Sequence, residues 1–464
     1  MPPPKPQLAQ RIACHLLSAR IGLPFVIVLL VLSAVLGYRQ SRLTGVTDIG
    51  PPFDLETYGH IDIDPAENAA SDYEAAEKLL VSNPKAEVED LDLVLEGGWH
   101  RATPDVKRWL QDNQAALDQW RIGTDKHQYL RIQLADLTLD NSVVSVSDSR
   151  TFMRLSRVAA ARALDDGMPN DAWRWYRALF RFSRHTGMHG SVIDRLVGAG
   201  FHSAATEDIV RWAGNDSTTT SQIMTALADI RSDYLMTGPR SANIRAEYIT
   251  ENDQLHRLDE VREFLNEFAF SQISPPSPPE MFFANEPELT ERLLRHQVAN
   301  LLRFVDLPRE ERPPMIPGDF IYFDAMPSES DGFLPPAEFQ AAVERSLLAK
   351  LTLLGSGLNR SIRREQTRQA LLETALAAEW YRREQGEFPQ RIEQLVDSGI
   401  LSSIPLDPVS APGDSLIYQR DADDPQAAKI WSVGEDGFDD GGDLERVPYS
   451  GPPDTGYVIG HAAQ

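Results

Sequence analysis

An uncharged apolar run near the N-terminus constrains the fold of this chain more than any other feature. Residues 21–38, IGLPFVIVLLVLSAVLGY, are eighteen residues without a charge. As a helix that rises about 1.5 Å per residue, the run spans about 27 Å, close to the ~30 Å hydrocarbon core of a bilayer. Pro24 falls in the first turn, where its missing N–H costs little. Arg20 and Arg39 flank the run and can reach headgroups. The run predicts a single transmembrane helix.

Two other interpretations of the run stay open at this point. A cleaved signal peptide has an apolar region of about 7–15 residues followed by small residues at the cleavage site. Residues 21–38 are longer than that, and Val35-Leu36-Gly37 matches a cleavage site poorly. A buried core helix would show an amphipathic period, which the run lacks. We therefore favour a retained anchor.

The basic residues around the run indicate its orientation. Three of them, Lys5, Arg11 and Arg20, precede it, and two, Arg39 and Arg42, follow it. The positive-inside rule then places the N-terminal tail in the cytoplasm. The sequence predicts an inner-membrane protein. The chain after the run, here called the body, is expected on the extracytoplasmic, periplasmic side.

The charge of the body excludes one class of partner. The first forty residues contain no Asp or Glu, so all 69 acidic residues lie after them, against 41 basic residues. A body this acidic repels nucleic acid, and we expect no nucleic-acid partner. The single cysteine, Cys14, precedes the run, so the body contains neither a disulfide nor a cysteine nucleophile.

The chain after the anchor has a mainly α pattern with Pro-rich interruptions. Thr103-Pro104 is a helix start. Helices are expected over 151–164, 170–185 and 192–212, an arrangement typical of a helical-repeat-like domain. The expected parts are a cytoplasmic N-tail (1–20), the transmembrane helix (21–38), an extended tether (39–66), a helical domain (67–273), a Pro-rich and helical connecting region (274–336), and a long helix with a small α+β module (337–464).

Details of the later segments are also predicted. The run Ser274–Pro279 is expected to be a loop or polyproline segment, because it contains four prolines. A long helix is expected from Pro336 to Leu354, and another from Arg363 to Glu384. Two strands are expected at Ser415–Arg420 and Lys429–Val433.

The C-terminal segment resembles the globular half of the major pseudopilin of type II secretion systems. In that family an amphipathic helix ends in an aromatic turn, and a "P.DP" segment, a small antiparallel sheet and an Asp-rich loop follow. The matching residues are Tyr381, Gly386, Phe388, Pro389, Pro405, Asp407, Pro408, Trp431, Ser432, Gly434, Asp436 and Gly437. The whole chain also resembles uncharacterised envelope proteins of planctomycete-type bacteria, a resemblance that implies no activity.

The Asp-rich loop is the one candidate metal site. Asp436, Asp439, Asp440 and Asp443 lie within eight residues, and neighbouring glycines let the backbone curl around an ion. Calcium takes six to eight oxygen ligands of this kind, and the pseudopilin resemblance also implies calcium here. A solvated acidic loop without an ion is the alternative that stays open.

No motif commits the chain to a reaction. It lacks a phosphate loop, a dinucleotide fingerprint and a nucleophile elbow. His185 and His189 have metal-ligand spacing, but Gly187 between them is expected to end the helix. We expect a membrane-anchored, non-catalytic protein that contacts other envelope proteins. The alternatives are an extracytoplasmic hydrolase with an acid pair in the helical domain, and an accessory component of a type II secretion-like apparatus.

Overall fold

The computed structural model describes a mainly helical protein with a small sheet near the C-terminus, as the sequence predicts. The described residues are 8–81, 88–142, 146–257, 276–307, 311, 315–317, 325–327, 336–349, 357–411, 413–434, 437–444 and 454–460. The chain divides into two compact units. Unit 1 comprises Met1–Pro52, Glu251–Asn300 and Pro313–Leu354, and unit 2 comprises Phe53–Thr250, Leu301–Arg312 and Gly355–Gln464. Each unit thus combines segments that lie far apart in the sequence.

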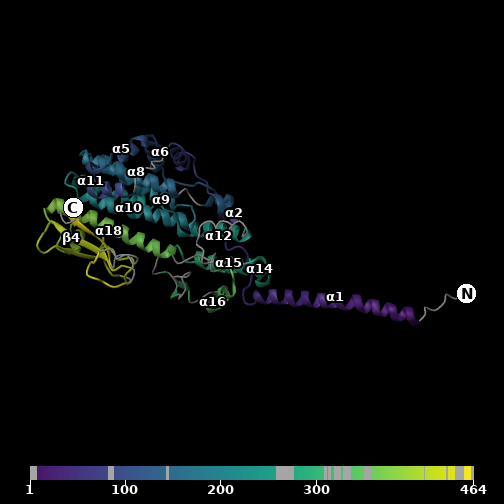
Figure 1. The fold of residues 1–464 in the computed structure, drawn as a ribbon. Helices are drawn as coiled ribbons and strands as arrows, with labels where there is room; N and C mark the ends of the chain where they lie inside the picture. Colours follow the sequence, from purple (N-terminus) through teal and green to yellow (C-terminus); the bar gives the residue numbers. More distant parts are fainter. Residues whose placement is uncertain are drawn as a thin grey trace. The chain divides into compact units, whose positions relative to one another are not determined.

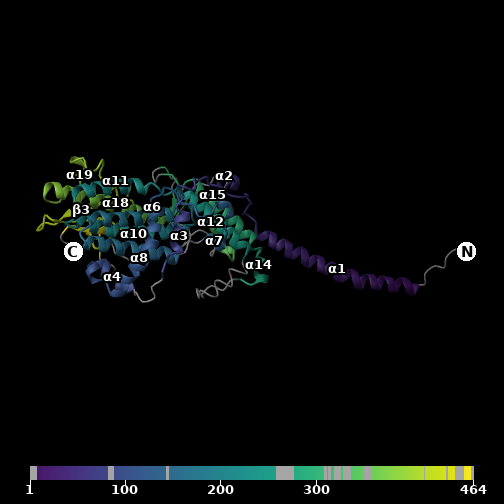
Figure 2. The ribbon, with the colours of Figure 1, turned by 90° about the horizontal axis from the view of Figure 1, so that it is seen from above.

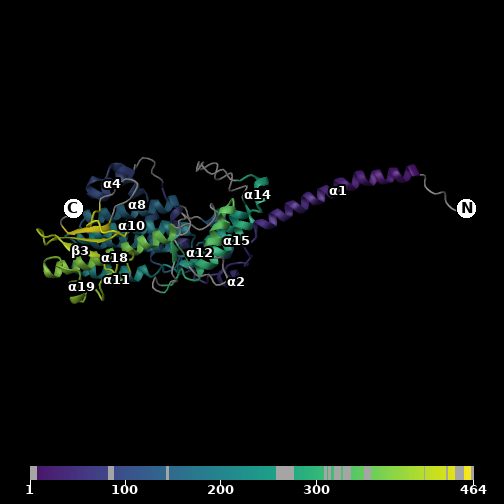
Figure 3. The same ribbon diagram turned by 90° about the horizontal axis from the view of Figure 1, so that it is seen from below.

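Unit 1 contains the long N-terminal helix. Its elements are α1 (Leu8–Arg42), α14 (Pro278–Ala284), α15 (Glu288–Leu302, which ends in unit 2), β1 (Met315–Pro317), β2 (Ala325–Pro327) and α16 (Pro336–Arg345). Helix α1 continues through Pro24 without a break. Strands β1 and β2, which the sequence did not predict, pair antiparallel. Figure 3 shows α14 beside the C-terminal end of α1.

The extended tether predicted over 39–66 begins within α1, which runs to Arg42, and the stretch directly after α1 is bonded to α15. Val46 is buried, and its carbonyl accepts a hydrogen bond from Arg292 Nη1 at 3.1 Å. The carbonyl of Thr47 accepts one from His296 Nε2 at 2.9 Å. The backbone carbonyls of Val46 and Thr47 lie outside any helix or strand, so they receive their hydrogen bonds from these side chains of α15. The chain that leaves α1 is consequently fixed to the rest of unit 1.

The long helix predicted from Pro336 to Leu354 ends earlier, at Arg345. Ser346 interrupts it: its hydroxyl donates to Glu286 Oε1 at 2.7 Å and accepts from the backbone N–H of Ala349 at 2.9 Å. A serine hydroxyl that accepts from a following N–H offers the backbone an alternative to continuing the helix. This break was not predicted, because the partner of Ser346 is distant in sequence; residues 350–354 of the predicted helix lie outside the described residues.

The proline run at Ser274–Pro279 contains a helix start. Helix α14 begins at Pro278, which suits the first helical position because its missing N–H would be unpaired there. Ser277 precedes it and forms a reciprocal capping box with Glu280. Residues 274 and 275 lie outside the described residues.

Unit 2 holds most of the helices and the three-stranded sheet. Its helices are α2 (Leu55–Tyr58), α3 (Ala70–Glu77), α4 (Val88–Gly97), α5 (Pro104–Asp112), α6 (Gln114–Thr124), α7 (Leu139–Ser142), α8 (Val146–Asp165), α9 (Pro169–Thr186), α10 (Val192–Gly214), α11 (Thr220–Tyr234), α12 (Arg240–His256, which ends in unit 1), α18 (Gly357–Gln385) and α19 (Glu393–Asp397), with 3₁₀ turns at Trp99–Arg101 and Leu134–Asp136. Its strands are β3 (Ile417–Arg420), β4 (Ala427–Ser432) and β5 (Thr455–Gly460).

Local sequence signals explain where these helices start and stop. The hydroxyl of Thr103 accepts from the N–H of Val106 at 3.3 Å and caps α5, as predicted. The predicted hairpin is α8 and α9, separated by Gly167 at a φ of 72°. Ser191 caps α10 through a capping box with Asp194. The three helices predicted over 151–212 are confirmed.

Helix α18 is the central element of unit 2. It packs on α10 and α11 and also on β4 and β5 (Figure 1). Figure 2 shows α8, α10, α18 and α11 side by side in that order. The apolar side chains that fill the space around α18 belong to one continuous core, which reaches from Ala69 to Ile459. The C-terminal helix and sheet are therefore part of the same core as the preceding helices.

The sheet of unit 2 is antiparallel in the order β3-β4-β5. Tyr418 lies opposite Ile430, which in turn lies opposite Tyr457. The two predicted strands are confirmed as β3 and β4, whereas β5 was missed. Gly386 ends α18 at a φ of 83°, a conformation that favours glycine, and Phe388 after it is fully buried. This turn places the sheet against α18.

Candidate functional site

Helix α1 is the first feature of the structure with a candidate function. Its segment Leu23–Arg42 is long enough and apolar enough to cross a membrane, and none of its apolar window is buried. The side chains of Leu23, Phe25, Leu30 and Leu36 are each more than half exposed. A row of large apolar side chains in water is unfavourable. This pattern excludes a buried core helix for the part of α1 from Leu23 to Leu36.

A second feature lies inside unit 2 and consists of Arg184, Arg195 and Glu365, here called the arginine–glutamate cluster. Arg184 Nη1 lies 2.7 Å from Glu365 Oε1, and Arg195 Nη2 lies 2.9 Å from the same oxygen. Arg184 and Glu365 are almost completely buried, and Arg195 is buried. Two guanidinium groups thus share one carboxylate, which leaves one net positive charge in the core.

The arginine–glutamate cluster is a costly arrangement. Arg184 Nη2 and Arg195 Nε and Nη1 find no hydrogen-bond partner among the described residues. Burial raises the pKa of Glu365, but the charges of Arg184 and Arg195 outweigh burial and lower it to about 2. Burial and the charge of Arg184 lower the pKa of the neighbouring His202 to about 3, so its imidazole is neutral. Glu365 is the acid that pairs with both arginines, and Arg184 also donates to the hydroxyls of Ser183 and Thr237.

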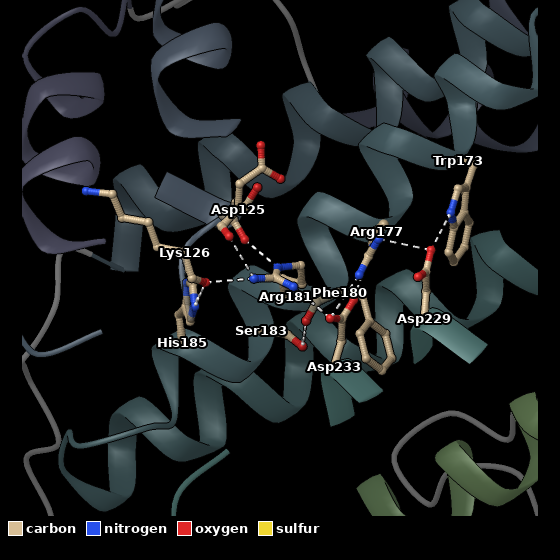
Figure 4. A network of polar contacts seen from close by, with 11 residues as sticks. Asp125, Lys126, Trp173, Arg177, Phe180, Arg181, Ser183, His185, Asp229 and Asp233 are labelled. Atoms are coloured by element: carbon tan, nitrogen blue, oxygen red, sulfur yellow. Dashed lines mark hydrogen bonds and ion pairs between the residues drawn. The ribbon is translucent and has the colours of Figure 1, made fainter. Parts of the chain in front are cut away.

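A larger polar network covers the neighbouring stretch of α9 (Figure 4). Arg181 Nη1 and Arg177 Nε each lie 2.7 Å from the carboxylate of Asp233 on α11. Arg177 Nη1 also reaches Asp229, which accepts from the indole N–H of Trp173 at 3.3 Å. The carboxylates of Asp229 and Asp233 are each already paired with an arginine, which suits a structural role.

Arg181 and His185 connect α9 to the end of α6. Arg181 Nη2 donates to the carbonyl of Lys126 at 2.8 Å, and His185 Nε2 lies 3.0 Å from the same oxygen. A carbonyl only accepts, so Nε2 carries the proton and Nδ1 accepts from the Tyr73 hydroxyl at 2.6 Å. Burial, followed by the charge of Arg181, lowers the pKa of His185 to about 3. His185 is a satisfied core histidine.

The histidine pair of the sequence does not form a metal site. Helix α9 ends at Thr186, with Gly187 as its C-cap, so His189 lies beyond the helix. The ring of His185 uses both nitrogens for Tyr73 and Lys126. The expectation that Gly187 ends this helix is confirmed.

A buried acid pair lies at the start of α10. Glu247 on α12 accepts from the backbone N–H of Val192 at 2.9 Å, and the buried Asp194 accepts from that of Ser191 at 2.9 Å. Burial, opposed by the Val192 hydrogen bond and aided by the charge of Asp194, raises the pKa of Glu247 to about 7. A carboxyl with this pKa exchanges its proton near neutral pH.

An open groove of about 280 Å³ lies along α5, α6, α8 and α9. Met168, which is 44% exposed, and Trp175 form its apolar part. Arg121 from α6 stacks over the ring of Trp175 at 5.8 Å. The acids Asp118 and Asp166 in its wall are exposed. An open groove with exposed charges around an apolar strip suits the binding of a polypeptide segment better than chemistry in a closed pocket.

The predicted calcium residues fall in the loop after β4. Asp436 lies outside the described residues. Asp439 Oδ1 accepts from the Trp431 indole N–H at 3.0 Å and from the N–H of Gly441 at 2.9 Å. Asp440 is exposed, and Asp443 contributes its carbonyl to the backbone N–H of Asp454 at 3.1 Å. The part of the loop that the structure describes brings no three carboxylates together around an ion.

The sequence did not single out Asp454, which is fully buried in this loop. Its Oδ2 accepts from the backbone N–H groups of Asp440 and Gly442, at 3.1 and 2.8 Å. Burial raises its pKa, and the charges of Asp439 and Asp440 raise it further. The ammonium of Lys429 lies 2.8 Å from the carbonyl of Gly442 and supplies a positive charge within the loop.

The arginine–glutamate cluster also escaped the sequence analysis. Arg184 continues the apolar stripe of α9, because it follows Trp173, Tyr176 and Phe180 at helical spacing. A charge on a predicted buried stripe is the signal that could have identified it. Its partner Glu365 lies 181 residues further along the chain, and no local pattern connects the two.

Comparison with known proteins gives no relative: no family model, no curated protein and no solved structure matches the chain. The fold itself defines a coarse class, a mainly helical protein with an N-terminal helix that can cross a membrane.

Proposed function

We propose that this chain is a single-pass protein of the bacterial inner membrane whose acidic body lies on the extracytoplasmic side and binds other envelope proteins without catalysing a reaction. The observation that carries the proposal is helix α1, which exposes its apolar side chains and is followed directly by a stretch of chain that is hydrogen-bonded to α15. The groove around Met168 and Trp175 offers a binding surface for a partner.

The pairing of the buried acids favours binding over catalysis. Asp208, Asp233 and Glu365 are each buried and each bonded to an arginine at 2.6 to 2.7 Å. The two arginines of Glu365 lower its pKa to about 2, so this carboxyl is a poor proton donor at neutral pH. The hydrolase alternative depends on Glu247 and Asp194, because Glu247 has the pKa of about 7 that a general acid needs.

The order of elements after α18 supports the pseudopilin-like interpretation of the C-terminal module. An amphipathic helix, a glycine turn at Gly386, the buried Phe388 and an antiparallel sheet follow one another. Asp407 of the "P.DP" segment accepts from the Ser432 hydroxyl at 2.8 Å and from the N–H of Val433 at 3.1 Å, which ties the segment to the end of β4. An accessory role in a type II secretion-like apparatus stays an alternative on this basis. The helical-repeat-like character of unit 2 likewise stays a proposal.

Calcium binding by the Asp-rich loop also stays a proposal. Its support is Asp454, whose buried Oδ1 finds no hydrogen-bond partner among the described residues and whose pKa is raised by burial and by its acidic neighbours. A divalent ion would relieve this repulsion. Calorimetric titration of the full chain tests it: binding heat at millimolar Ca²⁺ that Asp440→Asn abolishes is expected, and no heat in the wild type would reject the site.

Two matched positions test the binding role. Met168 in the groove and Met224 on α11 are 44% and 42% exposed. A photo-crosslinking amino acid at Met168 should give a discrete adduct with an envelope protein in intact cells, whereas the same group at Met224 should not. The absence of an adduct at Met168, or equal labelling at both sites, would count against the groove.

The sidedness is tested in the same chain with one cysteine at a time. A membrane-impermeant maleimide should label Met224→Cys in a Cys14→Ser background on intact spheroplasts. Native Cys14 should react only after permeabilisation, because we place residues 1–20 in the cytoplasm. The reverse pattern would invert the proposed orientation.

A further inference from the structure

Helix α14 exposes two adjacent aromatic rings in unit 1. The side chains of Phe282 and Phe283 are 50% and 47% exposed, and their ring centroids lie 5.5 Å apart in an edge-to-face arrangement. Ala284, which follows them, is buried, and Asn285 ends the helix in the left-handed conformation at a φ of 59°. The helix thus turns one small apolar surface away from the unit.

The last turn of α1 holds this helix in place. The guanidinium of Arg39 lies over the ring of Phe282, 4.2 Å from its centroid, and Arg39 Nη1 donates to the carbonyl of the same residue. Arg39 Nη2 donates to Asn285 Oδ1 at 2.6 Å, and Asn285 Nδ2 donates back to the carbonyl of Arg39 at 3.2 Å. Arg42 Nε adds a bond to the carbonyl of Ala284 at 3.4 Å. Several bonds from two arginines therefore fix α14 to the end of α1.

The position of Arg39 in the sequence sets the height of the aromatic pair relative to a bilayer. Arg39 directly follows Tyr38, the last residue of the uncharged run. That run is about 27 Å long and the hydrocarbon core about 30 Å, so the edge of the core falls at about Arg39. A ring 4.2 Å from the Arg39 guanidinium must then lie at the headgroup level. Aromatic side chains are enriched at that level.

From this geometry we infer that α14 is a second membrane contact, in which Phe282 and Phe283 enter the boundary between the headgroups and the acyl chains beside α1. The inference rests on the proposed function, because it requires α1 to span the membrane. The occupant is a lipid surface with anionic headgroups, because three arginines, Arg39, Arg42 and Arg345, lie at the junction and arginine binds phosphate groups. Arg42 donates to the carbonyl of Arg345, and Arg345 Nη2 to that of Thr44 at 3.3 Å.

Continuity with α1 favours lipid over a protein partner. The two rings adjoin a helix whose own apolar side chains are exposed along the described span. A surface that continues an apolar membrane-spanning helix meets the same bilayer. A span and an adjacent interfacial helix together restrain the tilt of unit 1 on the membrane, which a single span does not do.

The single native cysteine makes a direct test simple. In a Cys14→Ser background, Phe283→Cys, Leu30→Cys and Met224→Cys are each labelled with a nitroxide in the full chain. The chains are reconstituted at low density into vesicles of phosphatidylcholine and phosphatidylglycerol. Power saturation then compares the accessibility of each label to oxygen, which partitions into lipid, and to a water-soluble nickel chelate. Phe282→Cys repeats the measurement, and circular dichroism checks the fold of each variant.

We expect the oxygen-to-nickel ratio at Phe283 to shift from the value at Met224 towards that at Leu30. A Phe283 label as water-exposed as the Met224 label, with Leu30 in lipid, overturns the inference and leaves the anchor intact. A Leu30 label in water overturns the anchor itself. Spin–spin broadening at Phe283 that is absent at Leu30 would assign the rings to a second copy of the chain and also overturns the inference. Vesicles of phosphatidylcholine alone should reduce the shift, because they lack the anionic headgroups.

Discussion

Replacing Glu365 by Gln should strongly destabilise the protein. The carboxylate of Glu365 bonds to Arg184 at 2.7 Å and to Arg195 at 2.9 Å. Gln keeps the shape but removes the charge, so two guanidinium groups stay in the core without a counter-ion. Removing one partner of a buried ion pair costs about 3–5 kcal/mol. The free energy of unfolding at pH 7 should fall by about that amount.

The pH dependence gives a second measure of the same interaction. The pKa of Glu365 is lowered from 4.5 to about 2 in the folded state. A depressed carboxyl pKa stabilises the fold above pH 4.5, and this stability is lost as the pH falls from 4.5 to about 2. The shift is worth about 3 kcal/mol, at about 1.4 kcal/mol for each pH unit. The difference in unfolding free energy between the wild type and Glu365→Gln should therefore shrink by about 3 kcal/mol over that range.

The control is Glu373→Gln on the same helix. Glu373 pairs with Arg231 at 2.8 Å, but both side chains are partly exposed. An exposed pair contributes about 1 kcal/mol or less. Urea unfolding of the detergent-solubilised full chain, followed by circular dichroism, measures all three proteins. If Glu365→Gln costs no more than Glu373→Gln, or if its deficit is the same at pH 2 and pH 6, the buried-charge reasoning is wrong.

Three further predictions use the same assay. Gly198→Ala should be destabilising, because the new Cβ would lie 2.6 Å from a backbone carbonyl of α9. Gly200→Ala on the same helix meets nothing within 4 Å and should stabilise the protein by up to about 1 kcal/mol. Equal effects of the two substitutions would refute the close packing of α9 and α10. Burial raises the pKa of Glu247 in the folded state to about 7, so the wild type loses stability as the pH rises from 4.5 to 7. Glu247→Gln should therefore leave the stability unchanged below pH 4.5 and raise it above pH 7. A pH-independent effect would contradict this. The pKa of His185 is lowered to about 3, so the wild type loses stability as the pH falls from 6.5 towards 3. His185→Gln should weaken this pH dependence of stability. An unchanged pH profile would exclude a neutral His185.

The helices that the sequence predicted well have their determinants close by in the chain. The hydroxyl of Thr103 caps α5 by accepting a hydrogen bond from the N–H of Val106, only three residues further along the chain. The turn between α8 and α9 needs only Gly167, and the end of α18 needs only Gly386. Caps, glycine turns and apolar stripes act within one or two helical turns, so a single sequence contains the information.

The features that escaped prediction depend on partners far away in the chain. Ser346 ends α16 because Glu286 bonds to its hydroxyl, and that partner is 60 residues earlier. Strand β5 pairs with β4 across a long loop, and its sequence, TGYVIG, contains two glycines that weaken the strand signal. The candidate groove forms only when the four helices α5, α6, α8 and α9 have packed together. Secondary-structure propensity and hydrophobic periodicity do not specify such contacts between distant residues.

The arginine–glutamate cluster explains how a contact between residues far apart in the sequence can fix the position of α18. Around α18 the core contacts are made by Leu371, Leu372, Ala375 and similar small apolar side chains, which would accept a shift along the helix axis at moderate cost. Glu365 would not, because a slip of one turn, about 5.4 Å, would separate its carboxylate from both arginines and leave three charges unpaired. The apolar contacts hold α18 on α10 and α11, and the buried charge fixes its register. A net positive charge in the core is then the cost of joining the C-terminal helix and sheet to helices that precede them by more than 150 residues.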